Sequence, residues 1–258
     1  MYKISFIGAG NVTFRLSLAL KNAGNSIECI YNRNIENAEK VVRALKRNKS
    51  NAFATSDISQ VPESDIIIVA VSDNAISQVI PLIKDKSRFI VHTSGATSID
   101  VFKENGFTNY GVFYPLMTLS KNKDIDFKLV PFLIESKNNI DILVNLCAML
   151  KAEYKVCDSN KRLQMHTAAV FSTNFINYLL TLSYEIAYPD FTFLLPCAIE
   201  SVRKAFLNTP MVSQTGPAKR NDLETIEKHL QYLKENGKNE QYQIYKMLTE
   251  GIIKKYNE

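Results

Sequence analysis

Two closely spaced glycines near the start of the chain could bring the backbone close to a phosphate. They belong to the segment Gly8-Ala9-Gly10-Asn11-Val12-Thr13, which follows a short apolar run and opens a helical pattern. Glycines at such a turn let backbone N–H groups approach a pyrophosphate, and the start of a helix attracts anions. Thr13 stands where the usual fingerprint has a third glycine or an alanine, which loosens only the helix–strand packing. We predict a dinucleotide site at Gly8, Ala9, Gly10, Asn11 and Val12; a structural turn without a ligand is the alternative.

The end of the second expected strand bears on the choice between the two nicotinamide cofactors. An acidic side chain at that place accepts hydrogen bonds from the ribose hydroxyls of NAD, but this sequence has Asn32 there. The guanidinium of Arg33 could pair with a 2′-phosphate, to which Asn32 and Asn34 could also donate. The sequence therefore favours NADP over NAD. Asn34 could also cap the next helix, and the two roles are compatible.

Two further loops follow apolar strands at the edge of the sheet where open α/β folds bind ligands. The first carries Val71, Ser72 and Asp73, and the second carries Thr93, Ser94 and Gly95. We expect both loops to border the nicotinamide. The alternative is local: Ser72 or Asp73 caps a helix and Gly95 forms a turn.

A polar stripe runs along a long helix expected from Lys161 to Ala187, a segment without glycine or proline. At 100° per residue the stripe consists of His166, Val170, Thr173, Asn177 and Thr181, with Asn174 beside it. His166 could donate or accept a proton at a carbonyl or imine, and Asn174 could orient the substrate. We predict these two as catalytic residues, with Thr173 and Asn177 as substrate contacts. The alternative is a core histidine, and asparagines satisfied by the backbone or by a dimer partner.

A basic turn before a later helix offers a possible anion site. Lys219 and Arg220 precede a helix start, where they could hold a substrate carboxylate or phosphate, although an exposed basic turn is an equal alternative. His92 is a further candidate substrate contact. The three histidines lack the spacing of a metal site and the four cysteines are scattered, so we predict no metal and free thiols.

The elements that must position these residues alternate between strand and helix in the first half of the chain, as in a mostly parallel sheet. The run Ile66 to Val71 has no polar alternation and should be a central strand. Strands are expected at Lys3–Ile7, Ile27–Tyr31, Ala52–Ala54, Asp65–Val71, Phe89–Thr93, Gly111–Tyr114, Phe132–Glu135 and Glu153–Val156. Helical patterns alone follow. The fold class is α/β, with a Rossmann-type NADP-binding domain over residues 1–157 and an all-helical substrate and dimerisation domain over residues 158–258.

The composition fits an ordinary globular protein of 258 residues. No apolar run approaches the roughly 20 residues that span a bilayer, and the first residues lack the apolar stretch of a signal peptide, so we expect a cytoplasmic protein with no membrane association. The net charge of +5 raises the question of nucleic acid. The densest basic cluster, from Lys40 to Lys49, punctuates a helical pattern, which favours a solvated face and no nucleic-acid partner.

Six short motifs occur along the chain in a specific combination. They are Gly8-Ala9-Gly10-Asn11, Ala70-Val71-Ser72-Asp73, His92-Thr93-Ser94-Gly95, Phe113-Tyr114-Pro115-Leu116, His166-Thr167-Ala168-Ala169-Val170 with Asn174, and Gly216-Pro217 to Asp222 with His229. Together they resemble a bacterial family of uncharacterised Rossmann-like proteins with a C-terminal helical domain of unknown function, related to the pyrroline-5-carboxylate reductase and 6-phosphogluconate dehydrogenase-like superfamily.

The resemblance implies an N-terminal NADP domain, a helical domain that commonly forms a homodimer, and an active site between the domains with polar residues on the long helix. It therefore supports His166 and Asn174. The lysine that is catalytic in several of those dehydrogenases has no counterpart on the polar stripe. We expect an NADP-dependent oxidoreductase acting on a small anionic carbonyl, imine or hydroxy compound. The alternative is a catalytically inactive, dinucleotide-responsive binding or regulatory protein.

Overall fold

The structure is a computed structural model that describes residues 1–257. The chain divides into two compact units, of which the first covers Met1–Val170 and the second begins at Phe171. The sequence placed the boundary after residue 157, before the long helical run. In the structure the division falls inside that run, after Val170. The reason is that the first half of this run carries Arg162, whose buried side chain is bonded to the sheet of the first unit.

The first unit contains one mixed sheet that, in the described residues, has eight strands in the order β3-β2-β1-β4-β5-β6-β7-β8. The six strands from β3 to β6 are parallel, β7 is antiparallel to β6, and β8 is parallel to β7. Their bounds are β1 Lys3–Ile7, β2 Ser26–Tyr31, β3 Phe53–Thr55, β4 Ile66–Val69, β5 Ile90–His92, β6 Tyr110–Pro115, β7 Phe132–Ser136 and β8 Tyr154–Val156. All eight strands expected from the sequence are confirmed, and each bound lies within two residues of its expected position.

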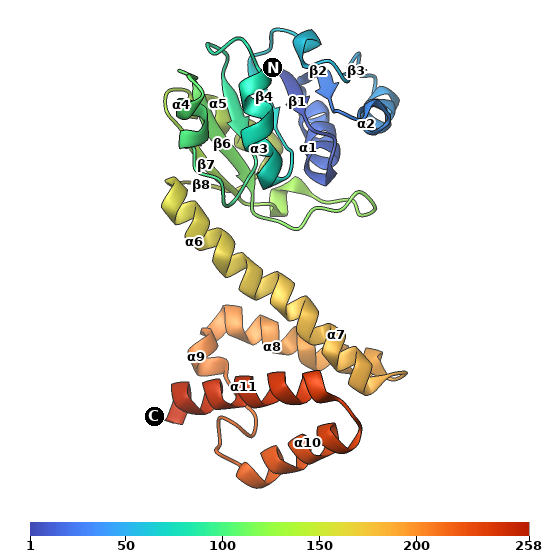
Figure 1. Ribbon diagram of the computed structural model, residues 1–258, viewed down its shortest axis with the longest axis vertical. Helices are drawn as coiled ribbons and strands as arrows, with labels where there is room; N and C mark the ends of the chain where they lie inside the picture. Colours follow the sequence, from blue (N-terminus) through green and yellow to red (C-terminus); the bar gives the residue numbers. More distant parts are fainter. Residues whose placement is uncertain (258) are drawn as a thin grey trace. The chain divides into compact units, whose positions relative to one another are not determined.

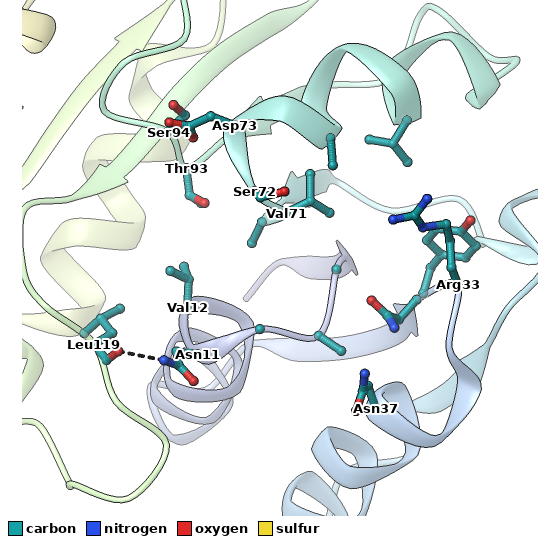
Figure 2. A pocket seen from close by; sticks show the side chains of 18 of the residues that line it. Asn11, Val12, Arg33, Asn37, Val71, Ser72, Asp73, Thr93, Ser94 and Leu119 are labelled. Atoms are coloured by element: carbon teal, nitrogen blue, oxygen red, sulfur yellow. Dashed lines mark hydrogen bonds between the residues drawn. The ribbon is translucent and has the colours of Figure 1, made fainter.

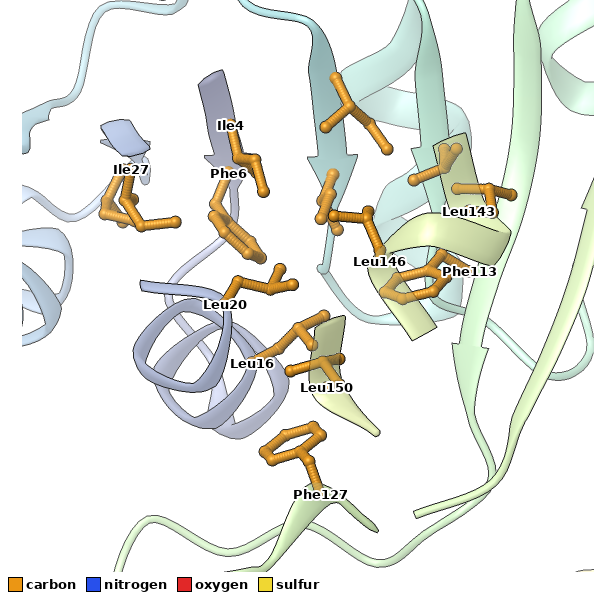
Figure 3. Close-up of a cluster of buried hydrophobic side chains, with 14 of the residues drawn as sticks. Ile4, Phe6, Leu16, Leu20, Ile27, Phe113, Phe127, Leu143, Leu146 and Leu150 are labelled. Carbon is orange, nitrogen blue, oxygen red and sulfur yellow. The ribbon is translucent and has the colours of Figure 1, made fainter. Parts of the chain in front are cut away.

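Helices cover both faces of this sheet (Figure 1). One face packs against α1 (Asn11–Asn22), α2 (Ile35–Arg47) and α5 (Ile140–Leu150), and its buried side chains include Phe6, Leu16 and Leu146 (Figure 3). The other face packs against α3 (Asp73–Val79) and α4 (Asp100–Glu104) through Ile76 and Phe102. Short 3-10 helices lie at η1 Ile58–Gln60, η2 Ile80–Leu82 and η3 Phe127–Leu129, and helix α6 (Ser159–Val170) ends the unit.

Strand β4 is buried along its whole length between β1 and β5. Alternate residues point to opposite faces, so Ile66 and Ile68 join the first core cluster while Ile67 and Val69 join the second. An uninterrupted apolar strand is what two covered faces require. The position predicted for this run at the centre of the sheet is confirmed, and the loop after it begins at the edge where the parallel strands end.

The second unit is helical throughout the part that the structure describes. It contains η4 (Phe171–Phe175), α7 (Ile176–Ala187), η5 (Phe191–Leu194), α8 (Leu195–Asn208), α9 (Pro210–Ser213), α10 (Leu223–Glu235) and α11 (Asn239–Asn257). The η4 segment is a π-helical turn. A π turn takes more residues than an α turn, so the 100° periodicity does not carry through it. The polar stripe predicted from His166 to Thr181 is therefore not one continuous face, which corrects the expectation of a regular helix.

The second unit buries few of its large apolar side chains. Among its described residues, those classed as buried hydrophobics are Leu182, Ala218, Ile226 and Leu233. Helix α8 leaves Phe206 80% exposed. Exposed apolar surface of this extent is typical of interaction surfaces.

Candidate functional site

A pocket of about 720 Å³ opens at the carboxyl edge of the parallel strands in the first unit. Residues from the ends of β1, β2, β4, β5 and β6 line it, together with residues of α1, α2, α3 and α6. Figure 2 shows Arg33 and Asn37 on one side and Asp73, Thr93 and Ser94 on the other. Of the predicted cofactor contacts, the pocket is lined by Gly8, Ala9, Gly10, Asn11, Val12, Asn32, Arg33, Val71, Ser72, Asp73, Thr93, Ser94 and Gly95.

The glycine turn at the floor of the pocket has a different physical requirement at each glycine. Gly8 has φ +108°, and a Cβ there would lie 2.2 Å from the Ala70 carbonyl oxygen at the end of β4. Its N–H donates to the Tyr31 carbonyl at 2.8 Å, which ties the turn to β2. Gly10 has an ordinary extended conformation, and no atom lies within 4 Å of the position that a Cβ would take there. The turn therefore has no room for a side chain at position 8, while Gly10 leaves space in which a ligand could touch the backbone.

The first turn of α1 is suited to an anion. Gly10 is its N-cap residue, no side chain caps it, and its first turn has no acidic residue. The N–H groups at a helix start have no partner within the helix and carry a partial positive charge. The Asn11 side chain is directed toward Leu119, and its Nδ2 donates to the Leu119 carbonyl at 3.1 Å (Figure 2). Together with the open space over Gly10, this arrangement fits the pyrophosphate of a dinucleotide.

The side of the pocket next to β2 carries the residues predicted to contact the ribose. Arg33 is exposed at the pocket rim, and Asn37 of α2 lies beside it (Figure 2). Asn32 donates from Nδ2 to the Asn34 carbonyl at 2.9 Å. Asn34 itself does not line the pocket; its Oδ1 accepts from the Glu36 N–H at 2.9 Å and caps α2. The guanidinium of Arg33 is therefore the cation available to a phosphate on this side.

The opposite side is formed by the loops after β4 and β5. Ser72 occupies the N-cap position of α3 without a side-chain cap bond, and Asp73 opens that helix. Ser94 accepts from the N–H groups of Ala96 and Thr97 at 3.1 and 2.9 Å, so its hydroxyl shapes the turn. This local role of the Ser94 hydroxyl coexists with the place of Ser94 on the pocket wall.

A histidine and a tyrosine meet on the same wall. The Tyr114 hydroxyl at the end of β6 lies 2.8 Å from Nδ1 of His166 on α6, and their rings pack edge to face. Gly95 makes this possible, because a Cβ there would lie 2.6 Å from the His166 ring and 2.8 Å from Tyr114 Cζ. Burial, and then the negative charge of Asp73, raise the pKa of Tyr114. The phenol is therefore protonated at neutral pH.

Helix α6 is held against this wall by a buried arginine. Arg162, one helical turn before His166, is 1% exposed and forms a salt bridge with Glu135 of β7. Its Nη2 also donates to the Thr97 carbonyl at 2.6 Å and to the Ser159 hydroxyl at 3.0 Å. Residues four apart on a helix share a face. Anchoring Arg162 therefore fixes the height and rotation at which His166 meets Gly95.

Sequence reasoning missed several residues that line the pocket, above all Tyr114 and Lys121. Tyr114 could have been found, because it ends a parallel strand at the same edge as the loops already singled out. Nothing in the spacing around Lys121 predicted its position, because its loop lies more than a hundred residues from the glycine turn that it meets. Further lining residues missed are Tyr31, Asn37, Ala70, Ala75, Gln78, Val79, Leu82 and Leu119.

Other predicted residues lie outside the pocket. His92 is fully buried, stacks on Phe102, and accepts from the Ser94 N–H at Nδ1. Burial, and then the charge of Arg162, lower its pKa to about 3, so it is a neutral core histidine. Asn174, Thr173, Asn177, Lys219 and Arg220 belong to the second unit. Lys219 there stacks on the Tyr256 ring at 4.6 Å and donates to the Tyr256 carbonyl.

The described residues lack the features of two other classes of site. Within residues 1–257, no helix is long and apolar enough to cross a membrane. The same part of the chain holds no cluster of three or more histidine, cysteine or acidic side chains suited to a metal ion. The four cysteines are free thiols; Cys29 and Cys147 are buried, Cys157 is partly buried and Cys197 is exposed.

The chain is similar in sequence and in fold to known proteins. Residues 3–94 match the family described as NADP oxidoreductase, coenzyme F420-dependent, and residues 130–252 match the domain of unknown function DUF2520. No curated protein matches the sequence. Among solved structures, a Bacteroides fragilis protein provisionally named an NADP oxidoreductase is 32% identical, with a TM-score of 0.85 and 98% of each chain covered.

Two more distant structures share the fold over nearly the whole chain. A Thermotoga maritima protein is 20% identical, with a TM-score of 0.71 and coverage of 99% of this chain and 100% of its own. A 1-pyrroline-5-carboxylate reductase from Streptococcus pyogenes is 13% identical, with a TM-score of 0.59 and coverage of 99% and 98%. These two likenesses confirm the fold that the sequence indicated.

Proposed function

The chain belongs to a family that joins an NADP oxidoreductase-type domain to the DUF2520 domain, and from this premise we propose that it is an NADP-dependent oxidoreductase. One observation supports the proposal: the same pocket has the glycine turn at its floor and His166, bonded to Tyr114, on its wall. When bound, the nicotinamide would supply or accept a hydride. The substrate we propose is a small anionic carbonyl, imine or hydroxy compound.

The cofactor side of the proposal assigns a role to each part of the pocket. The N–H groups around Gly10 and the start of α1 would bind the pyrophosphate. Arg33 would pair with the 2′-phosphate of NADP, because a guanidinium matches a phosphate in geometry and no acidic side chain stands at the end of β2 to bind the ribose of NAD. Val71, Thr93 and the turn at Ser94 would border the nicotinamide.

The proton would be managed by His166. Reduction of a carbonyl adds a hydride to carbon and a proton to oxygen, and dehydrogenation removes both. Tyr114 occupies Nδ1 of His166, so Nε2 is the nitrogen left to exchange a proton with substrate. A protonated His166 would donate from Nε2 as the hydride arrives, and a neutral one would accept the proton in the opposite direction. For Nε2 to accept a proton, Nδ1 must carry the ring hydrogen and would donate it to the Tyr114 oxygen, which would keep the ring oriented.

The first test is a titration with NADPH and with NADH that follows the emission of the nucleotide itself. The chain has no tryptophan, so protein emission does not interfere strongly. We expect micromolar binding of NADPH, and Arg33→Ala should weaken it by about tenfold or more, the loss of one charge-assisted pair, while leaving NADH unaffected. Arg43→Ala, which removes an exposed arginine paired with Glu39 on α2, is the matched control. Binding of neither nucleotide would overturn the proposal.

The second test separates an enzyme from a dinucleotide-responsive binding protein. Oxidation of NADPH is screened with a panel of keto acids and cyclic imines, using wild type and His166→Gln. An enzyme should lose about a hundredfold or more in kcat on loss of its proton donor, with NADPH affinity unchanged. Cofactor binding without turnover of any of these substrates would favour the regulatory alternative.

For assembly we propose a homodimer formed through the second unit. The apolar side chains left exposed on α7 and α8 include Tyr184, Ile199 and Phe206. Because the unit's own core is small, this surface must be covered whenever the chain is folded, and a second copy is the partner that is always present. Analytical ultracentrifugation should give twice the chain mass, and Phe206→Glu should shift the chain toward monomer. A wild-type monomer at micromolar concentration would contradict this.

A further inference from the structure

The loop of residues 116–126, which follows β6 and which we call the β6 loop, is fastened to helix α1. Arg15 donates from Nε to the Ser120 carbonyl at 2.8 Å and from Nη2 to the Lys121 carbonyl at 2.7 Å. It also forms a salt bridge with Asp124. The Arg15 side chain is only 10% exposed, so its two bonds to the carbonyl groups are partly shielded from water, whereas the Asp124 side chain is fully exposed. The loop is therefore held beside the glycine turn rather than left free.

This attachment directs one cation into the cofactor pocket. Lys121 lines the pocket, and its Nζ donates to the Ala9 carbonyl at 3.2 Å, between the two glycines of the turn. Among the salt bridges of residues 1–257, none involves Lys121. An ammonium group has three donors, and the carbonyl accepts only one of them. The cation thus stands at the glycine turn without a carboxylate to neutralise it.

We propose that Lys121 binds the pyrophosphate of the dinucleotide and that Arg15 is the residue that positions it. The inference rests on the proposed function, because it assigns a further contact within the same cofactor site. The helix start supplies partial charges and N–H groups, and Lys121 supplies a full charge from the other side. A pyrophosphate has two negative charges, so both can act on it together.

The pyrophosphate is common to NADPH and NADH, whereas the 2′-phosphate belongs to NADPH alone, and this difference gives the test. Lys121→Met keeps most of the apolar stem and removes the charge. We expect the Kd of both cofactors to rise by a similar factor of about ten, as for one charge-assisted hydrogen bond. Arg33→Ala should instead affect NADPH alone. Lys121→Arg, which keeps the charge, should retain most of the affinity.

The matched control is Lys123→Met, which removes one positive charge from an exposed position of the same loop. Unchanged affinity of Lys121→Met for both cofactors would overturn the inference and leave the proposed function intact. A loss confined to NADPH, or an equal loss in Lys123→Met, would also overturn it. Failure of the wild type to bind either cofactor would instead remove the proposed function, and this inference with it.

The positioning role of Arg15 is tested by a double-mutant cycle. Arg15→Met should weaken the binding of both cofactors in the wild-type background. Its effect on Kd should be smaller when Lys121 is already methionine, because Arg15 and Lys121 act through one contact. Strictly additive losses in Kd would contradict the coupling. Thermal unfolding of each variant, followed by far-ultraviolet circular dichroism, separates a displaced loop from a damaged fold, since a displaced loop changes affinity with little change in midpoint.

Discussion

The two glycines of the turn should respond differently to the same substitution. In Gly8→Ala the new methyl would meet the Ala70 carbonyl oxygen at 2.2 Å and Val71 Cγ1 at 2.9 Å, on a backbone with φ +108°. The left-handed conformation costs an L-residue about 1–2 kcal/mol, and overpacking against backbone adds about 1–3 kcal/mol. We expect the free energy of unfolding to fall by about 3 kcal/mol. Cofactor binding should be lost as well, because the turn must move.

Gly10→Ala should impair binding without impairing stability. No atom lies within 4 Å of the new methyl, and φ −77° suits alanine. The gain of about 0.4–1 kcal/mol from a stiffer unfolded chain offsets a similar loss of N-cap preference. If the pyrophosphate touches the backbone here, the methyl displaces it from about two charge-assisted hydrogen bonds, which corresponds to about a hundredfold in Kd.

The assay combines urea unfolding, followed by far-ultraviolet circular dichroism, with NADPH titration. Gly24→Ala is the matched control, because Gly24 also has a positive φ, +91°, but has open space around it. It should show the backbone strain of about 1–2 kcal/mol alone, with normal binding. Wild-type affinity in Gly10→Ala would refute the place assigned to the pyrophosphate. Equal stability losses in Gly8→Ala and Gly24→Ala would refute the role assigned to the contact with Ala70.

Two further predictions concern buried groups that support the site. The lowered pKa of His92, about 3, means that the unfolded chain binds a proton below its ordinary pKa near 6.5 while the folded chain does not. Stability should therefore fall by about 2 kcal/mol between pH 7 and pH 5 from this group alone. His92→Asn, whose Oδ1 can still accept from the Ser94 N–H, should reduce that slope in urea unfolding; an unchanged slope would contradict the assignment. Arg162→Met should lower the free energy of unfolding by about 3 kcal/mol, because it leaves the Glu135 carboxylate without its cation. Adding Glu135→Gln should recover part of this loss, and simple additivity would show that the pair is not coupled.

The sequence by itself determined the strands, the glycine turn and the edge of the sheet at which the pocket lies. Each of these depends on neighbours in the chain: a short strand such as Lys3–Ile7 with its apolar residues, a turn that follows it, and a helix that follows the turn. In a parallel sheet the ends of successive strands necessarily meet at one edge. Local patterns were therefore enough to bring Gly10, Arg33 and Ser94 to one pocket.

Tertiary structure alone decided which distant residues complete that pocket. Tyr114 and His166 are 52 positions apart and meet because Arg162 fixes α6 and because Gly95 has no side chain. Lys121 reaches the glycine turn only because the β6 loop is bonded to Arg15. The π turn after Val170 is a similar case. Its hydrogen bonds span five residues instead of four, so the polar stripe predicted from the 100° spacing is not continuous. Contacts between segments depend on how helices are anchored and on where space is left between them. The spacing of residues along one segment predicts neither the anchoring nor the space.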